Sequence, residues 1–188
     1  MHGMVTVQRM TAQEYLAIPD DGERVRCELI EGEIVVNQPG LTHQRVCREM
    51  FFALHAWTLA APSRGEVTFP IDVLVDDRNV FGPDILWYAD GRVPDPEARP
   101  YAVPDLVVEV RSPSTWRYDI GAKKAAYERN GLPELWLVDT PVREVLAFRR
   151  SSPGCSTFDV SLELGPQDTL DSPLLPGFAV VLGALFGG

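Results

Sequence analysis

The segment from Leu106 to Arg111 places a glutamate in the middle of an otherwise apolar run. Because side chains alternate between the two faces of a strand, Glu109 would share its face with Val107 and Arg111. Glutamate is disfavoured in strands and is rarely buried without a partner. A chain that folds around this strand must therefore supply Glu109 with a compensating group.

A second acid, Asp84, stands directly before another apolar run and would share a strand face with Leu86. An unpaired carboxylate near a core is costly, and hard divalent cations take carboxylate oxygens as ligands. A cation shared by Asp84 and Glu109 would compensate both acids. The alternative is a salt bridge from Glu109 to Arg111 or Lys123 without a metal.

Three polar side chains follow the Glu109 strand at steps of four, namely Asp119, Lys123 and Tyr127. On a helix they would lie on one face, and a helix packed beside the strand would let Lys123 reach Glu109. A lysine near two carboxylates and a metal can orient or deprotonate a water, or stabilise charge on a phosphate. Asp119 would orient Lys123 or stabilise the first helical turn. The alternative places Lys123 on the helix surface.

The remaining chain mixes helical and strand patterns, which predicts an α/β fold with a central mixed sheet flanked by helices. Trp57, Trp87 and Trp136 are expected in the core, whereas Trp116 would stack on a base or pack under its loop. An irregular loop is expected from Pro94 to Pro104. Helices are predicted over residues 11–16, with a capping box at Thr11, from a cap at Thr42 to near Pro62, and over 118–130. Strands are predicted over residues 25–30 and 33–36, joined by a tight turn at Glu31-Gly32, and over 67–75, 84–88, 106–111, 135–138, 143–149 and 157–164, with residues 174–186 closing the core.

The length of 188 residues predicts a single domain over 1–188, with residues 1–10 flexible or loosely attached. The three cysteines form no C-x-x-C pair, which favours reduced thiols in a cytoplasmic protein. Residues 1–10 do not read as a signal peptide. The apolar stretch 174–186 is too short to span a bilayer, so we expect no membrane association.

The net charge of −10 is unusual for a protein that binds nucleic acid, because phosphate contacts need Lys and Arg. The acid surplus is not uniform, however. Five basic and two acidic residues lie between Arg111 and Arg129, a local charge of +3. Charge alone favours a solvated helix face over a nucleic-acid contact in this segment.

The whole pattern resembles the PD-(D/E)XK nuclease superfamily and, within it, the Uma-two family of restriction endonuclease-like proteins. The resemblance covers roughly residues 10–186, and its most specific part runs from Glu109 to Asp139. It rests on the segments Cys27 to Gly32, His43-Gln44, Pro83-Asp84, Val107 to Thr115, Glu134 to Asp139 and Pro176 to Phe178, and on Asp119, Lys123, Tyr127 and Gly131.

The resemblance implies a restriction-endonuclease-like fold in which Asp84 and Glu109, with the backbone carbonyl of Val110, ligate Mg²⁺ or Mn²⁺. It also implies that the usual lysine has moved, because Arg111 stands two residues after Glu109. Arginine stays protonated and is a poor base, so Lys123 is the expected substitute. Supporting roles are expected for Glu28, His43, Arg111 and Asp119.

We therefore predict a metal-dependent endonuclease that hydrolyses DNA, with Asp84, Glu109 and Lys123 as catalytic residues. A homodimer is expected, because duplex cleavage usually needs two sites and a two-fold dimer supplies them. Two alternatives remain open at this point. One is a non-catalytic nucleic-acid or protein binding module on the same fold, and the other is a metal-dependent hydrolase of small phosphates.

Overall fold

The structure is a computed structural model that describes residues 9–19 and 26–187. Most of the N-terminal segment 1–10 lies outside these residues, so the expectation for that segment concerns residues that are not described. Within the described part, the backbone N–H of Met10 donates to the carbonyl of Gly32 at 2.9 Å.

A six-stranded mixed sheet forms the centre of the molecule, with strands β3 (Glu66–Thr68), β6 (Ile85–Tyr88), β7 (Leu106–Val110), β8 (Glu134–Asp139), β9 (Glu144–Arg149) and β10 (Val160–Leu164). Their order across the sheet is β10-β9-β8-β7-β6-β3. β7 and β8 run parallel, and the other neighbouring pairs are antiparallel. A parallel pair needs a crossover connection, which the helical segment between β7 and β8 supplies. The predicted α/β fold with a mixed central sheet is confirmed.

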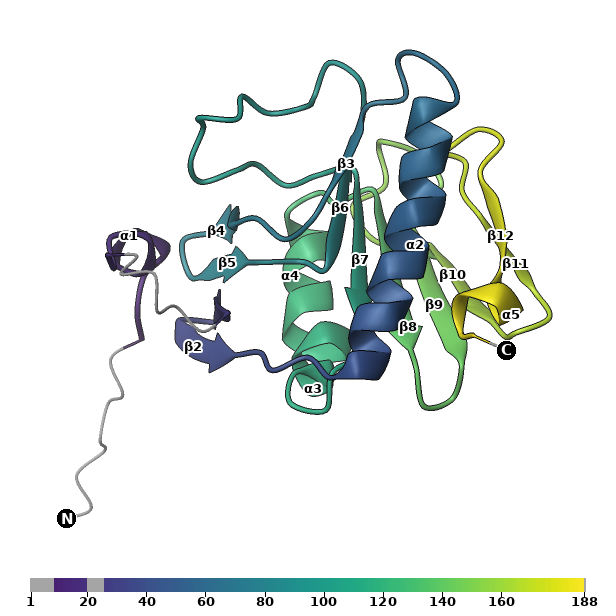
Figure 1. The fold of residues 1–188 in the computed structure, drawn as a ribbon. Coiled ribbons are helices and arrows are strands. Elements are labelled where there is room, and N and C mark those ends of the chain that lie inside the picture. Colours follow the sequence, from purple (N-terminus) through teal and green to yellow (C-terminus); the bar gives the residue numbers. More distant parts are fainter. Residues whose placement is uncertain (1–8, 20–25, 188) are drawn as a thin grey trace.

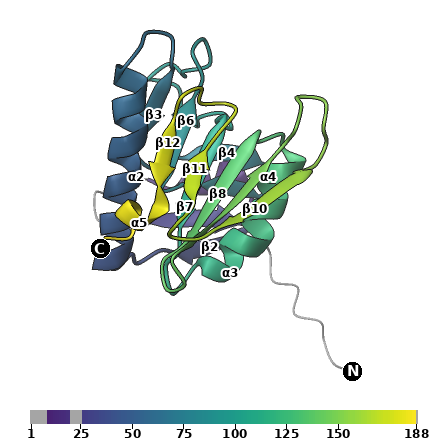
Figure 2. The same ribbon diagram turned by 90° about the vertical axis from the view of Figure 1, so that its right-hand side faces the viewer.

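Helices cover both faces of this sheet (Figures 1 and 2). One face carries the long helix α2 (Leu41–Leu59), the hairpin β11 (Thr169–Asp171) and β12 (Ala179–Val181), and the short helix α5 (Leu182–Leu185). The other carries α3 (Trp116–Tyr118), the π-helix η1 (Asp119–Lys123) and α4 (Lys124–Arg129). The predicted helix 118–130 is thus present, with a wider turn in its first half.

Two apolar clusters follow from the alternation along β7. Leu106, Val108 and Val110 pack with α2 and α5, whereas Val107 packs with α4. The expected core positions of Trp57, Trp87 and Trp136 are confirmed, since all three are buried. Glu109 points to the α4 side, so this glutamate needs its partner from the α3–η1–α4 segment or from the second sheet.

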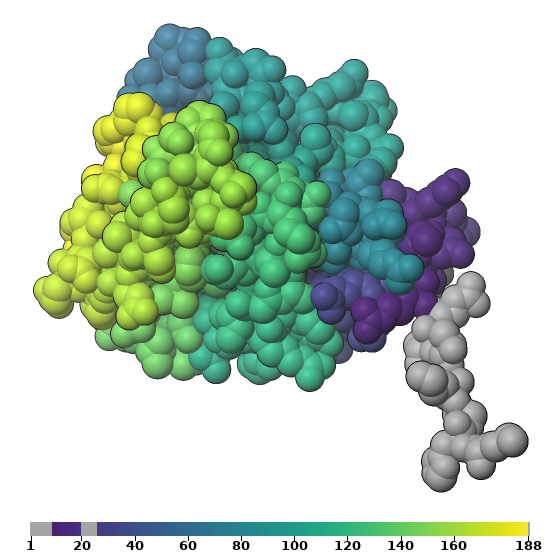
Figure 3. All heavy atoms as spheres, turned by 180° about the vertical axis from the view of Figure 1, so that it is seen from behind, coloured from purple at the N-terminus to yellow at the C-terminus, as the bar shows by residue number. Residues whose placement is uncertain are grey.

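That second sheet has four strands, β1 (Cys27–Ile30), β2 (Glu33–Val36), β4 (Val73–Asp76) and β5 (Asn79–Phe81), in the order β2-β1-β5-β4. The expected tight turn at Glu31-Gly32 joins β1 to β2, and both of its residues have positive φ. Helix α1 (Ala12–Leu16) begins with the predicted capping box at Thr11. Figure 3 shows this purple N-terminal segment lying against the blue-teal strands of the second sheet.

Two local predictions are corrected by the structure. The strand expected over residues 67–75 is divided into β3 and β4, which belong to different sheets. Pro70 stands at the break, and proline cannot donate to a ladder. Helix α2 begins at Leu41 after Gly40, which provides no side-chain cap, rather than being capped by Thr42.

Within residues 9–19 and 26–187, no helix combines the length and apolar character needed to cross a membrane. The three cysteines are free thiols.

Candidate active site

The strand register brings Asp84 and Glu109 to one place. Ile85 in β6 pairs with Val108 in antiparallel β7. Asp84 precedes Ile85 and Glu109 follows Val108, so these two acids form the next pair of facing positions. Residues that face each other in an antiparallel pair share a sheet face. Both carboxylates are almost fully buried, on the face that the sequence alternation predicted.

Lys123 lies among three carboxylates on that face. Its Nζ is 2.6 Å from Glu109 Oε1, 2.9 Å from Glu28 Oε1 and 3.3 Å from Asp119 Oδ1. The lysine side chain is 1% exposed. Lys123 therefore reaches Glu109 as predicted, and the alternative of a helix-surface lysine is excluded by its burial.

Further hydrogen bonds hold these acids in place. The Tyr127 hydroxyl donates to Glu109 Oε1 at 3.0 Å, and the N–H of Gly82 donates to Glu28 Oε1 at 2.8 Å. The Thr115 hydroxyl donates to Asp119 Oδ2 at 3.4 Å. The contacts come from β1, β7 and the crossover helix, so the cluster ties both sheets to the helical segment.

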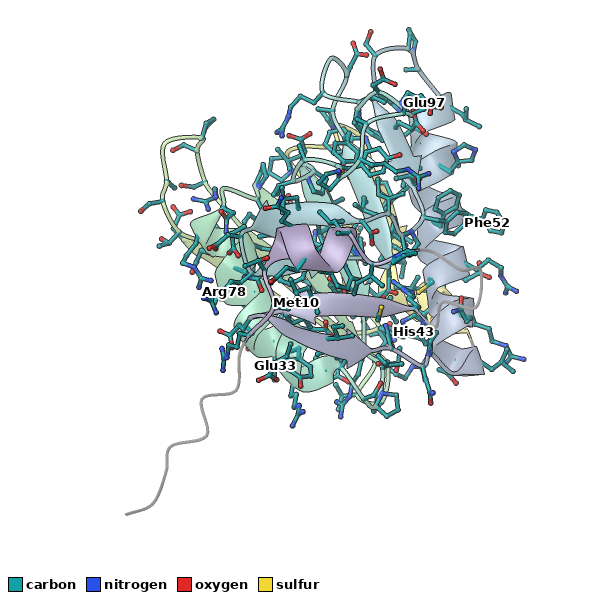
Figure 4. All side chains as sticks on the ribbon, turned by 90° about the vertical axis from the view of Figure 1, so that its left-hand side faces the viewer. Met10, Glu33, His43, Phe52, Arg78 and Glu97 are labelled. Atoms are coloured by element: carbon teal, nitrogen blue, oxygen red, sulfur yellow. The ribbon has the colours of Figure 1, made fainter. Side chains whose placement is uncertain are left out.

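Asp84 has different surroundings. Its Oδ2 accepts the backbone N–H of Val110 at 2.8 Å and lies 3.1 Å from His43 Nε2. Its Oδ1 lies 3.0 Å from an Arg26 guanidinium nitrogen without the geometry of a hydrogen bond, and this buried oxygen has no hydrogen-bond partner among the residues that the structure describes. Figure 4 shows His43 near the start of α2, beside the strands that carry this site.

Burial and charge shift the pKa values of the cluster in opposite directions. Burial raises the pKa of Glu109 well above its usual value although Lys123 opposes the shift, and it raises the pKa of Asp119 to about 6. Burial also disfavours the charged form of Asp84. The hydrogen bond from His43 and the charges of His43 and Arg26 outweigh this effect and lower the Asp84 pKa.

The pKa of Lys123 is raised well above its usual value. Burial disfavours the ammonium, but the charges of Glu109, Glu28 and Asp119 outweigh that effect. These charges favour the ammonium form of Lys123, which donates hydrogen bonds and does not accept a proton.

A second set of possible metal ligands overlaps with Asp84. One ligand atom each from His43, Cys47 and Asp84 lie within 4.8 Å of one another, and all three residues are buried. His43 and Cys47 are four residues apart on α2, and their Nδ1 and Sγ atoms are 3.5 Å apart. Burial raises the pKa of the Cys47 thiol strongly, which disfavours the thiolate that metals prefer.

Arg111 and Trp116, both singled out in the sequence, make their contacts outside the carboxylate cluster. The Arg111 guanidinium donates to both Asp139 oxygens at 2.9 Å and lies over the Trp116 ring. Trp116 is half-buried against the core. Arg111 follows Glu109 by two residues but does not pair with it, because Asp139 at the end of β8 balances the charge of the guanidinium.

Sequence reasoning missed Arg26 and Cys47. Arg26 precedes β1 and stands two residues before Glu28, a spacing that places both side chains on one face of an extended chain. That signal was available in the sequence. Cys47 lies one helical turn after His43, and the same kind of spacing could have indicated it.

A hollow of about 370 Å³ opens at Asp84. Helix α2 and the connection between β3 and β4 form its walls, and His43, Cys47, Arg26 and Asp84 are among the residues that line it. Asp84 is thus reached from this hollow, whereas Lys123 is not among its lining residues.

The comparisons with known proteins agree with the fold. The family model Uma2, described as "Putative restriction endonuclease", matches residues 12–183. A solved structure described as that of "a putative nuclease belonging to DUF820 from Anabaena variabilis ATCC 29413" is similar with a TM-score of 0.78 and 19% identity. The match covers 94% of this chain and 97% of that chain. No curated protein matches the chain.

Proposed function

Because the chain belongs to the Uma2 family of "Putative restriction endonuclease" proteins, we propose that it hydrolyses phosphodiester bonds in DNA at the cluster of Asp84, Glu109 and Lys123. The observation that carries this proposal is the convergence of Asp84 and Glu109 at the ends of paired strands, with Lys123 2.6 Å from Glu109. The hollow that opens at Asp84 gives a substrate access to that carboxylate.

The donor set fits a divalent cation such as Mg²⁺ or Mn²⁺. Asp84 Oδ1 is a buried oxygen for which residues 9–19 and 26–187 offer no hydrogen-bond partner. Around it, the four carboxyl groups of Glu28, Asp84, Glu109 and Asp119 outnumber the three basic side chains of Arg26, His43 and Lys123. Asp84, Glu109 and the carbonyl of Val110 would hold the cation. When bound, such a cation polarises a phosphoryl oxygen and lowers the pKa of a water.

The protein's own residues position this site. His43 and the N–H of Val110 hold Asp84, while Lys123 and Tyr127 hold Glu109. Lys123 contributes positive charge close to the reacting phosphate and does not remove a proton, because its neighbours keep it protonated. Asp119 keeps Lys123 in place through their 3.3 Å contact.

We further propose a homodimer and a cytoplasmic location. A two-fold dimer would place two sites on the two strands of a duplex. Three free thiols and no disulfide among them agree with a reducing compartment.

The test uses supercoiled plasmid and single-stranded circular DNA with Mg²⁺ or Mn²⁺. Asp84→Asn and Glu109→Gln keep the side-chain shapes and are expected to abolish cleavage of whichever substrate the wild type cuts. Glu163→Gln is the matched control, because Glu163 is an exposed acid on the edge strand β10, and it should cut like the wild type. Equal cleavage by all four proteins would show that a contaminating nuclease is being measured and would reject the proposed site.

One contact favours the alternative of a non-catalytic binding module. The Arg26 guanidinium lies 3.0 Å from Asp84 Oδ1, where it competes with a metal for the carboxylate. Calorimetric titration with Mn²⁺ separates the two functions. We expect saturable binding that Arg26→Gln strengthens and Asp84→Asn abolishes, whereas no binding by wild type or Arg26→Gln at pH 7.5 would support the non-catalytic module.

A further inference from the structure

The hollow at Asp84 has an aromatic wall, and we refer to it below as the aromatic pocket. Phe51, Phe52 and Phe69 all line it, and His43 and Asp84 are among its other lining residues. Its volume of about 370 Å³ lies in the range of pockets that hold small organic groups. The pocket therefore joins a surface for flat rings to the proposed site.

The rings form a stack that ends in solvent. The Phe51 and Phe69 rings are stacked with centroids 4.0 Å apart at an angle of 11°, and His55 stacks near Phe51 at 5.6 Å. Phe69 is 55% exposed although Phe51 covers one of its faces. Phe52 is 58% exposed and points outward from α2 in Figure 4. A further flat ring can thus extend this stack without any core side chain moving.

Positive charge surrounds the same rings. Arg26, Arg45 and Arg48 line the aromatic pocket, and Asp84 is the only acid among the described residues that line it. Arg48 pairs with Glu49 at 2.7 Å. In a chain of net charge −10, this basic wall indicates an anionic ligand with flat rings.

A second copy of this chain is a poorer occupant. Leu41, Arg45, Arg48 and Phe52 recur along α2 at steps of three and four, so they lie on one helix face. Two-fold packing of this face would bring arginines close to arginines, opposed by the buried Asp84 of the pocket and by Glu49, which is already paired with Arg48. A nucleic acid supplies both the rings and the negative charges.

We infer that the aromatic pocket binds an unpaired nucleotide of single-stranded DNA, with its base stacked on Phe69 and in edge-to-face contact with Phe52, whose ring is steeply inclined to the Phe51–Phe69 stack, and with its phosphates beside Arg45 and Arg48. Bases in an intact duplex are already stacked and paired, whereas unpaired bases stack readily on exposed aromatic side chains. The inference deepens the proposed function and rests on it, because the bound strand would pass Asp84. Single-stranded DNA is then the preferred substrate class.

The test measures binding alone, by fluorescence anisotropy in EDTA, so that it does not depend on cleavage. The probes are a labelled 12-nucleotide oligodeoxythymidine and a blunt duplex of the same length. We expect the single strand to bind at least about tenfold more tightly than the duplex. Phe52→Ala and Phe69→Ala should each weaken it by about fivefold or more, as expected for loss of one stacked base.

Leu59→Ala is the matched control. Leu59 is 73% exposed on the same helix but does not line the aromatic pocket, so this variant should bind like the wild type. Phe52→Trp and Phe69→Tyr keep a ring and should retain binding, which separates loss of stacking from loss of folding.

Tighter or equal binding of the duplex would overturn the inference, as would phenylalanine variants that bind like the wild type. A wild-type dimer in sedimentation that Phe52→Ala dissociates would also overturn it, in favour of a second copy. The nuclease proposal is tested independently of this inference. If DNA is cut without these binding differences, only this inference is wrong, and if the differences appear without any cleavage, only the nuclease proposal is wrong.

Discussion

At the scale of single residues, the cluster depends on one buried ammonium group. Lys123 contacts Glu28, Glu109 and Asp119, and it has almost no contact with solvent. Removing one partner of a buried ion pair typically costs about 3–5 kcal/mol, because the other charge is left uncompensated. We expect Lys123→Met to lower the free energy of unfolding by about that amount in urea denaturation at pH 7.5.

Lys124→Met is the matched control for this prediction. Lys124 is the next residue along the chain, half-buried, with its ammonium 4.4 Å from the Phe148 ring centroid. Loss of such a contact should cost roughly 1 kcal/mol or less. Similar losses for the two variants would contradict the central role given to Lys123.

The Lys123 defect should also depend on pH, with a direction set by the carboxyl groups. The pKa of Asp119 is raised from 3.8 to about 6, mainly by burial, and that of Glu109 is raised well above its usual value. Groups with raised carboxyl pKa values keep protons that the unfolded chain releases, so their contribution to stability falls as the pH rises through about 4 to 6 and beyond. Without Lys123 these pKa values rise more. Urea curves should therefore show a smaller Lys123→Met defect at pH 5 than at pH 7.5, and the reverse order would contradict this account.

Residue-scale prediction from the sequence succeeded where one physical constraint acted locally. A glutamate inside an apolar strand requires a partner, and Glu109 has Lys123 and Tyr127 within hydrogen-bonding distance. Arg26 was missed although its spacing from Glu28 was visible in the sequence, because its contact with Asp84 is created by the approach of two sheets. Which cation faces which acid is decided by this tertiary packing. The catalytic roles of Asp84, Glu109 and Lys123 remain predictions.

At the scale of elements, the crossover after β7 is helical as predicted but contains the π-helix η1 over Asp119–Lys123. A π-helical turn has no clear sequence signature, because it forms when a helix adjusts to its surroundings, often at functional sites. Here the surroundings are the three carboxylates around Lys123. The broken strand at Pro70 is a different case, since its signal was present in the sequence.

Two glycine substitutions test these elements. A Cβ on Gly121, inside η1, would meet nothing within 4 Å, so Gly121→Ala should raise the free energy of unfolding by about 0.4–1 kcal/mol. A Cβ on Gly65, where φ is +69°, would lie 2.0 Å from the Tyr88 carbonyl oxygen. Gly65→Ala should therefore destabilise the β3–β6 pair by more than about 1 kcal/mol. Urea denaturation measures both, and a destabilised Gly121→Ala would show that this helical turn has another conformation.

At the scale of the whole molecule, the proposed binding of single-stranded DNA has to be reconciled with a net charge of −10. The opposing charges are local, since Arg45 and Arg48 lie beside the exposed rings of the aromatic pocket. Electrostatics therefore cannot supply most of the affinity, as they do in strongly basic nucleic-acid binding proteins. Stacking and contacts at the proposed site must supply the remainder.

If stacking supplies most of the affinity, the binding constant for single-stranded DNA should depend only weakly on salt concentration. For single strands the slope of log K against log salt is about −0.7 for each phosphate neutralised, so two arginine contacts give about −1.4. The affinity for oligodeoxythymidine should then fall only about sevenfold between 50 and 200 mM salt. Arg45→Gln should reduce the slope by about 0.7, whereas Phe69→Ala should weaken binding and leave the slope unchanged, because a ring neutralises no phosphate. A slope steeper than about −4 would require more phosphate contacts than the arginines of the aromatic pocket can make, and it would place the main nucleic-acid surface elsewhere on the molecule.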